Sequence, residues 1–300
     1  MLYRPPMALF FQLPAHSKIT IMKRIFLIVT IAISTVLLFN SCDMPEGPYI
    51  EANPYTGVYD SDLPIRKILV EDFTGWNCVN CPKASQKLTE LQNIHGGHII
   101  LVSIHYGFFA IPFSPGDPDF ATEVGADIGE SFSIPQELPK GMINRKLFEG
   151  GSNYHWEPED WASRIVDILK VNKFADVDID LSPEYNEADS MLSLGAVCVK
   201  VSDVELPLSL VMYLIESDIE GRQKNGSQLI EDYQHNHVFR GGIIEDDPTW
   251  GEEIALPFFK NYNFKFQSEW DANHCSVIAV VYNTLTLEVI QAEEVHVIEE

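Results

Sequence analysis

The pattern of apolar and polar residues changes near the middle of the chain. In the first half, continuous apolar runs alternate with segments whose apolar residues recur at helical spacing. The runs predict strands, and the spaced segments predict helices, at 68–73 (strand), 82–94 (helix), 98–105 (strand), 119–131 (helix), 142–144 (strand) and 157–171 (helix). This order is typical of an α/β domain, which we place over residues 65–172.

The second half consists of short apolar segments separated by turn residues. They predict strands at 177–181, 192–201, 206–216, 255–266, 276–283 and 288–297. We expect an all-β immunoglobulin-like sandwich over residues 173–300, so the predicted fold class is an α/β domain followed by a sandwich. The polar segment 218–251 is too long for a plain hairpin, and we expect a functional loop there.

The N-terminal segment shows neither pattern. An apolar run over residues 25–39 follows the basic Met22-Lys23-Arg24; it is too short for a comfortable transmembrane helix and suits a signal peptide. The run ends at Asn40-Ser41-Cys42, which resembles a bacterial lipoprotein signal cleaved ahead of an acylated Cys42. An uncleaved anchor helix and an ordinary signal peptide are the alternatives.

These features predict how the N-terminus is processed. We expect residues 1–41 to be removed, including an upstream stretch, 1–21, that precedes the more natural start at Met22. Residues 42–64 are rich in proline and predict an extended tether. Lipid on Cys42 would then hold the protein at the cell envelope. We expect the outer membrane, on either its periplasmic or its surface face.

The charge of the chain limits its partners. It has 44 acidic and 20 basic side chains, giving a formal net charge of −24 at pH 7. Such a surface repels phosphate, so we expect no nucleic-acid partner. It also repels anionic headgroups, so membrane attachment should depend on the lipid rather than on a basic patch.

The motif Cys78-Val79-Asn80-Cys81 carries the clearest chemistry. It follows a predicted strand and opens a predicted helix, where unpaired amide groups and the helix dipole favour a thiolate. This context predicts thiol–disulfide exchange by a Cys78–Cys81 pair, with a static disulfide as the alternative. A zinc site is disfavoured because a second C-x-x-C or a pair of histidines is missing. We expect neither a metal nor a cofactor.

The surroundings of these cysteines resemble thioredoxin. Asp72-Phe73 stands on the preceding strand. Pro139 in L-P-K-G-M-I-N is the natural candidate for the family's cis-proline, and Pro135 is the second candidate. The resemblance implies that Cys78 attacks, that Cys81 resolves the mixed disulfide and that Asp72 exchanges a proton with Cys81. It further implies that Pro139 faces the disulfide.

Other residues of the motif extend the resemblance and also depart from it. The resemblance implies substrate contacts by Trp76 and Leu138. Thioredoxin places its tryptophan directly before the first cysteine, whereas here Asn77 intervenes. The central pair Val79-Asn80 has neither proline nor histidine, so the direction of electron flow stays open.

The remaining cysteines fit an exported protein. If Cys42 is acylated, Cys198 and Cys275 accompany the C-x-x-C pair, an even number in an oxidising compartment. They fall in separate predicted strands and could bridge the two sheets of the sandwich, as in immunoglobulin-type domains. Two separate buried thiols are the alternative.

Two histidines stand in the polar segment 218–251. In a strand, His235 and His237 would share one face, as metal ligands can, with Glu231 or Asp232 nearby. No third ligand is fixed by spacing, so locally hydrogen-bonded histidines are the better interpretation.

Four motifs together are similar to the outer-membrane-protein-28-related lipoproteins of Bacteroidetes. They are G-W-N-C-V-N-C-P-K-A, L-P-K-G-M-I-N-R, D-Y-x-H-N-H-V-x-R and the terminal V-I-Q-A-E-E-V. The resemblance implies an anchored protein with a thioredoxin-like region followed by an immunoglobulin-like sandwich.

Two functions are compatible with these features. The first is thiol–disulfide exchange on the thiols or disulfides of exported proteins, which leaves open whether the protein is an enzyme. The alternative is a non-catalytic outer-membrane or surface binding or adhesion lipoprotein with a structural disulfide. The sandwich, the segment 218–251 and the aromatic loop Phe108-Phe109-Ala110-Ile111-Pro112-Phe113 favour the alternative.

Overall fold

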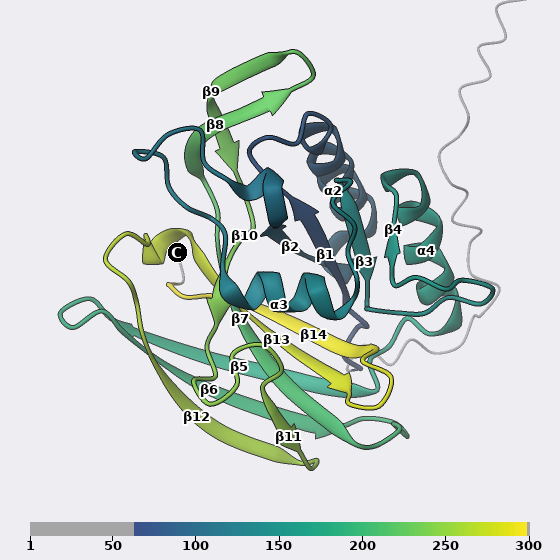
Figure 1. Cartoon of the computed structure of the whole chain (residues 1–300). Helices are drawn as coiled ribbons and strands as arrows, with labels where there is room; N and C mark the ends of the chain where they lie inside the picture. The colour runs from purple at the N-terminus through teal and green to yellow at the C-terminus, as the bar shows by residue number, and fades with distance from the viewer. Residues whose placement is uncertain (1–62, 299–300) are drawn as a thin grey trace, which may run out of the picture. The chain divides into compact units, whose positions relative to one another are not determined.

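The computed structural model describes residues 63–298 (Figure 1). The signal segment 1–41, Cys42 and all but the last two residues of the tether lie outside the described residues. No helix within 63–298 has both the length and the apolar character needed to cross a membrane. Strand makes up 42% and helix 20% of the described residues.

The elements of the first half lie close to the positions that the apolar pattern predicts. They are β1 (Ile68–Thr74), α2 (Cys81–His95), β2 (Ile99–His105), α3 (Glu123–Ser131), β3 (Lys140–Ile143), β4 (His155–Trp156) and α4 (Pro158–Val171). Helix α4 begins at Pro158 and α2 has Pro82 as its second residue, positions at which a missing N–H group costs little. Thr122 caps α3 by accepting a hydrogen bond from the amide of Gly125.

The second half contains more strands than predicted. The strands are β5 (Val177–Asn186), β6 (Met191–Lys200), β7 (Leu208–Glu216), β8 (Ile219–Asn225), β9 (Gln228–His235), β10 (Val238–Gly242), β11 (Glu252–Ile254), β12 (Phe258–Lys265), β13 (Cys275–Asn283) and β14 (Val289–His296). Three of them, β8, β9 and β10, fall in the segment 218–251 that the sequence presents as a polar loop.

The predicted fold class, an α/β thioredoxin-like domain followed by a separate sandwich, is wrong. Strands from both halves form one mixed sheet in the order β14-β13-β7-β10-β2-β1-β3-β4, with β11 beside β7. Strand β10 joins the halves, because Val238 pairs in parallel with Ser103 of β2 and antiparallel with Glu216 of β7. The described residues therefore lie in one compact unit that is mostly β.

Strand β7 is buried on both faces. Leu208, Leu210 and Met212 belong to a core that is shared with the second sheet, whose order is β12-β6-β5. Val211 and Tyr213 belong to the opposite core, which also contains residues of β1, β2 and α3. The C-terminal strands thus pack as two facing sheets, and one of those sheets continues into the first half of the chain.

A buried ion pair lies where the halves meet. Arg145 donates from Nε to Glu71 Oε2 at 2.9 Å and from Nη2 to Glu71 Oε1 at 2.6 Å, and Nη2 also donates to the Tyr213 hydroxyl at 2.6 Å. The guanidinium lies within 6.0 Å of the ring centroids of four aromatic side chains, Phe132, Tyr213, Trp250 and Tyr282. We call this group of residues the Arg145 junction.

The ionic state of the Arg145 junction follows from its geometry. Burial alone would lower the pKa of Arg145, but the Glu71 carboxylate raises it above its ordinary value. Arg145 therefore stays charged, and its bonds connect β1 and the end of β3 with β7 of the second half.

Candidate functional site

The cysteines of the C-x-x-C motif form a disulfide at the start of α2. Cys78 is 1% exposed and Cys81 is 2% exposed, and both belong to the core between the sheet and α3. A cysteine that attacks a protein substrate is normally accessible to it. In this structure, neither sulfur is open to a protein-sized partner.

The β8–β9 hairpin, residues 219–235, covers the disulfide. Figure 1 shows it at one end of the molecule, near the N-terminus of α2. The amide of Lys224 donates to the carbonyl oxygen of Trp76 at 3.0 Å, and the amide of Gly226 donates to that of Val79 at 2.9 Å. The hairpin therefore runs along the turn that the disulfide closes.

Gln223 fastens the same turn through its side chain. Its Nε2 donates to the carbonyl oxygens of Gly75 at 3.2 Å and Cys78 at 3.1 Å. The side chain is buried, and the pairing of β8 with β9 shifts register between Gly221 and Gln223. A bulge of this kind redirects a side chain, here toward the cysteine turn.

Local sequence explains why the hairpin forms. Asn225 pairs with Gln228, so Gly226 and Ser227 make a two-residue turn, and Gly226 has φ +59°. A glycine at the first of the two turn positions is a strong signal for such turns because glycine adopts positive φ without strain. The Gly226-Ser227 dipeptide could have revealed the hairpin from the sequence alone.

The hairpin lies on an aromatic floor. The Trp76 ring stacks on Phe120 with centroids 4.6 Å apart and meets the His235 ring edge-on at 4.8 Å. A Cβ atom at Gly221 would lie 2.9 Å from the Trp76 ring, so only glycine allows β8 to approach this closely. Trp76, which the thioredoxin resemblance assigns to substrate contact, is fully buried here.

Polar groups without partners lie beside the disulfide. Asp72 is 2% exposed, its Oδ1 has no hydrogen-bond partner, and burial raises its pKa to about 7. Both ring nitrogens of His105 also lack partners. Burial, together with His235 and Arg240, lowers the pKa of His105.

A small hollow connects these groups with the disulfide. Asp72, Cys81, His105, Tyr233 and His235 are among the residues that line it, and its volume is about 20 Å³. This is about enough space for one water molecule. Burial lowers the pKa of His235 to about 4, so this imidazole is neutral at pH 7.

Asp72, Leu138 and Pro139 are the other residues to which the thioredoxin resemblance gives a role. Asp72 lies on β1 and pairs with Gly141 of β3. The Leu138–Pro139 peptide bond is cis, and Leu138 belongs to the same core as the two cysteines. The catalytic and substrate-binding roles of these residues stay predictions.

The second predicted disulfide is wrong. Cys198 and Cys275 are both free and buried in the core between the two sheets. Burial raises the pKa of Cys198 to about 12 and raises that of Cys275 as well. Each thiol contributes to the core as a small apolar side chain.

The two histidines of the polar segment do not share a strand face. His235 ends β9, whereas His237 lies between β9 and β10 with φ 56°. Among residues 63–298, no group of three or more histidine, cysteine or acidic side chains is arranged to hold a metal ion.

Exposed apolar side chains lie on the cysteine turn, on the loop after β2 and on the hairpin. Phe108 is 67% and Ile111 is 55% exposed, and Val79 and Leu229 are also exposed. Asn77 fastens the loop after β2 through bonds from its backbone amide to the carbonyl of Phe109 and from its side chain to that of Ile111. We call Val79, Phe108, Ile111 and Leu229 the apolar rim.

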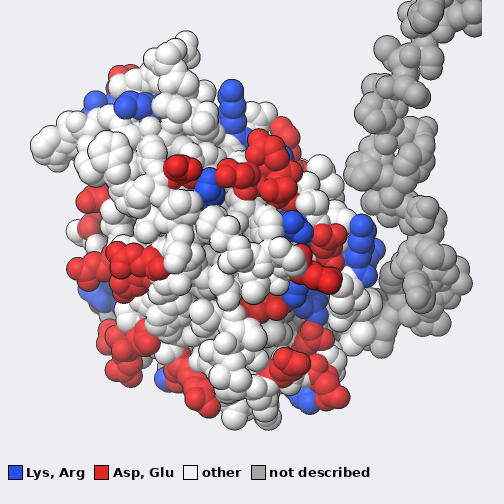
Figure 2. All heavy atoms as spheres, turned by 45° about the vertical axis from the view of Figure 1, so that its right-hand side comes forward, with Lys and Arg blue, Asp and Glu red and all other residues white. Residues whose placement is uncertain are grey.

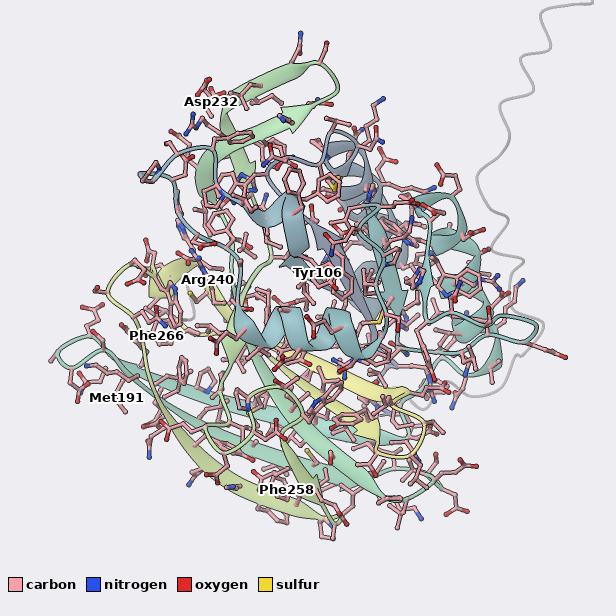
Figure 3. All side chains as sticks on the ribbon, in the orientation of Figure 1. Tyr106, Met191, Asp232, Arg240, Phe258 and Phe266 are labelled. Carbon is pink, nitrogen blue, oxygen red and sulfur yellow. A yellow bond between two sulfur atoms is a disulfide. The ribbon has the colours of Figure 1, made fainter. Side chains whose placement is uncertain are left out.

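The stretch that contains Phe108 and Ile111 is uncharged, although the chain is strongly acidic. Residues 106–116 contain no charged side chain, although the chain as a whole has a formal net charge of −24. Figure 2 shows acidic side chains in groups over the visible face, with uncharged areas between them. Asp232 lies on the outer side of the hairpin (Figure 3), and its side chain is exposed.

Comparisons with known proteins identify relatives of the second part of the chain. The family described as outer membrane protein Omp28 matches residues 135–300, so the match begins after the disulfide. No curated protein matches the chain.

Two solved structures from Porphyromonas gingivalis are similar. HBP35 is 14% identical over 78% of this chain and 76% of its own, with a TM-score of 0.58, which indicates a shared fold. A domain of the outer membrane lipoprotein Omp28 is 21% identical over 41% of this chain and 88% of its own, with a TM-score of 0.32.

Proposed function

Since the chain belongs to the Omp28 family of outer membrane proteins, we propose that it is a non-catalytic binding lipoprotein whose Cys78–Cys81 disulfide is structural. Family membership confirms the predicted location, a lipid-anchored protein at the outer membrane of the cell envelope. The acylation of Cys42 remains a prediction, because this residue lies outside the described part of the chain.

One observation carries the proposal, namely the burial of both sulfurs in a core beside the cysteine turn, to which the β8–β9 hairpin is bonded. Thiol–disulfide exchange needs a thiolate to reach a sulfur atom, and its rate depends on that access. With Cys78 only 1% exposed, a folded protein substrate has no route to the attacking position while the hairpin is in place.

The disulfide has a structural use in this arrangement. It closes the turn whose carbonyl groups accept the bonds from Gln223, Lys224 and Gly226. A fixed turn holds the hairpin and the loop after β2 in place, and these segments carry most of the apolar rim. Exposed apolar side chains on a fixed frame suit a protein-binding surface.

Thiol–disulfide exchange on exported proteins is the second candidate function. The observation in its favour is Asp72, whose pKa of about 7 and position beside Cys81 in the same hollow suit proton transfer. This candidate requires the hairpin to leave the disulfide before each reaction.

A redox titration of the full-length protein in detergent separates the two functions. Cys198→Ala and Cys275→Ala, made together, leave the C-x-x-C pair as the source of titratable thiols once Cys42 is acylated. We expect the pair to stay oxidised below about −300 mV, as structural disulfides do. A midpoint above the thioredoxin value of about −270 mV would contradict the proposal.

A catalytic assay with the same background completes the test. We expect no reduction of a model protein disulfide above the rate of a Cys78→Ser, Cys81→Ser variant. Turnover that depends on the two cysteines would establish the exchange function instead.

A further inference from the structure

The β8–β9 hairpin is connected to the sheet by two residues in an unusual backbone conformation. Asp218, between β7 and β8, has φ 57°, and His237, between β9 and β10, has φ 56°. Aspartate and histidine adopt this region more readily than most residues, and here each marks a point where the backbone turns between the sheet and the hairpin. The hairpin forms a sheet of its own, so it is built to move as one body about these two residues.

Besides its packing on the aromatic floor, hydrogen bonds from the hairpin hold it at two places. The first is the cysteine turn, which accepts the bonds of Gln223, Lys224 and Gly226. The second is the loop before α3, where Arg222 donates from Nε to Asp117 at 3.1 Å and from Nη2 to Ser114 at 2.7 Å. All of these groups would be hydrated if the hairpin lifted.

Several buried polar atoms beside the hairpin have no hydrogen-bond partner. They are Asp72 Oδ1 and both ring nitrogens of His105, and both residues line the same hollow as Gln223, Tyr233 and His235 of the hairpin. An unpaired buried donor or acceptor costs about 1–3 kcal/mol, and opening of the hairpin would give these atoms access to water. The closed state is therefore less favourable at this site than its hydrogen bonds to the cysteine turn suggest, which lowers the free energy of opening.

We propose that the β8–β9 hairpin is a hinged cover whose opening sets the rate at which the Cys78–Cys81 disulfide is reduced. The reductant is a small external dithiol. Its thiolate attacks one sulfur, the Cys78–Cys81 bond breaks, and a mixed disulfide forms. The second thiol of the reductant then displaces the protein thiolate. Two electrons and two protons pass to the pair, and the reductant becomes a cyclic disulfide.

The test measures the rate of reduction by dithiothreitol in the full-length native protein. Thiol release is followed in the Cys198→Ala, Cys275→Ala background. If opening limits the reaction, the rate becomes independent of dithiothreitol at high concentration. Gln223→Ala removes both side-chain bonds to the cysteine turn, and we expect the rate to rise about five- to tenfold.

A second variant acts without touching the cysteine turn. Gly221→Ala places a methyl group against the Trp76 ring, and we expect it to lift the hairpin and accelerate reduction similarly. Gln228→Ala is the matched control, because Gln228 belongs to the same hairpin and is exposed. Its reduction rate should equal that of the parent, and far-ultraviolet circular dichroism confirms that each variant is folded.

Two results together would overturn the hinged cover. The reduction rate would stay proportional to the dithiothreitol concentration throughout, and it would be equal in the parent, Gln223→Ala and Gly221→Ala. Acceleration in these two variants and none in Gln228→Ala would establish it. The proposed function is tested by the reduction potential, which is an equilibrium quantity. The hinged cover is tested by the rate of reduction, so one proposal can fail while the other holds.

Discussion

Two neighbouring carboxylates on β1 have opposite surroundings. Glu71 is fully buried and receives two hydrogen bonds from Arg145. Asp72 is also buried, but its Oδ1 has no partner, and its pKa rises to about 7. Successive residues of a strand point to opposite faces, so one carboxylate enters the Arg145 junction and the other lies beside the disulfide.

The difference separates a permanent connection from a displaceable one. Buried charges are tolerated when they are paired and hydrogen-bonded, as at the Arg145 junction. The polar groups beside the disulfide are instead enclosed by a hairpin that lies on them without satisfying them. The first region keeps the two halves of the chain together, and the second is arranged to open.

Breaking the Arg145 junction should have the largest effect. Arg145→Leu leaves Glu71 buried without a counter-charge, and we expect a loss of about 3–5 kcal/mol in the free energy of unfolding. Denaturant titration measures it. Replacing Glu71 by leucine in the same chain should restore much of this loss, because no unpaired charge remains. A loss below about 1 kcal/mol for the single variant would contradict the importance of the junction.

Asp72→Asn should stabilise the protein, whereas Arg145→Leu destabilises it. The folded-state pKa of about 7 lies above the unfolded value of 3.8, so the contribution of Asp72 to stability is complete below pH 4 and is lost as the pH rises through 7. We therefore expect the asparagine variant to be more stable than the parent by roughly 4 kcal/mol at pH 8, with little gain near pH 4.

Thermal unfolding of the parent and the Asp72→Asn variant at both pH values checks this pattern. Equal stability at pH 8 would mean that Asp72 is hydrated or paired in solution, contrary to the buried site in the structure.

His235, which lines the hollow, should cause a smaller loss of stability at acid pH. The pKa of His235 is lowered to about 4, below its ordinary 6.5, so the unfolded chain binds a proton first as the pH falls. Stability should decrease by about 3 kcal/mol between pH 7 and pH 4 on account of this residue. His235→Gln removes the titrating group, and its stability should fall correspondingly less over that range; identical pH profiles would count against a buried neutral imidazole.

Loosening the hairpin should change global stability least. Gln223→Ala leaves the carbonyl groups of Gly75 and Cys78 without this donor, and we expect a loss of about 1 kcal/mol in the free energy of unfolding. Denaturant titration beside the exposed control Gln228→Ala measures the difference. A loss as large as that of Arg145→Leu would show that the hairpin belongs to the permanent core.

Sequence patterns predicted elements well and their assembly poorly. The buried runs of β1, β2 and β13 and the helical spacing of α2 and α4 were visible because each element is long and its period is regular. Strand β10 was missed because Val238 and Phe239 are its only large apolar residues and glycines follow them. Without β10, the two halves could not be recognised as parts of one sheet.

The candidate site was predicted in its chemistry but not in its exposure. The C-x-x-C spacing and the strand before it identified the disulfide, which depends on local sequence alone. The cover depends on contacts between residues that lie far apart in the chain, such as Gln223 with Cys78. Such contacts cannot be predicted from the spacing of apolar residues, although the Gly226-Ser227 dipeptide marks the turn of the hairpin.

Hydrogen–deuterium exchange of the oxidised, full-length protein tests the central claim most directly. The amides of Lys224 and Gly226 donate to the cysteine turn only while the hairpin is closed. We predict that both exchange more slowly than an unstructured chain by a factor on the order of 100, yet faster than the core amides of β13. Exchange at the unstructured rate, with β13 still protected, would mean that the hairpin does not cover the disulfide in solution.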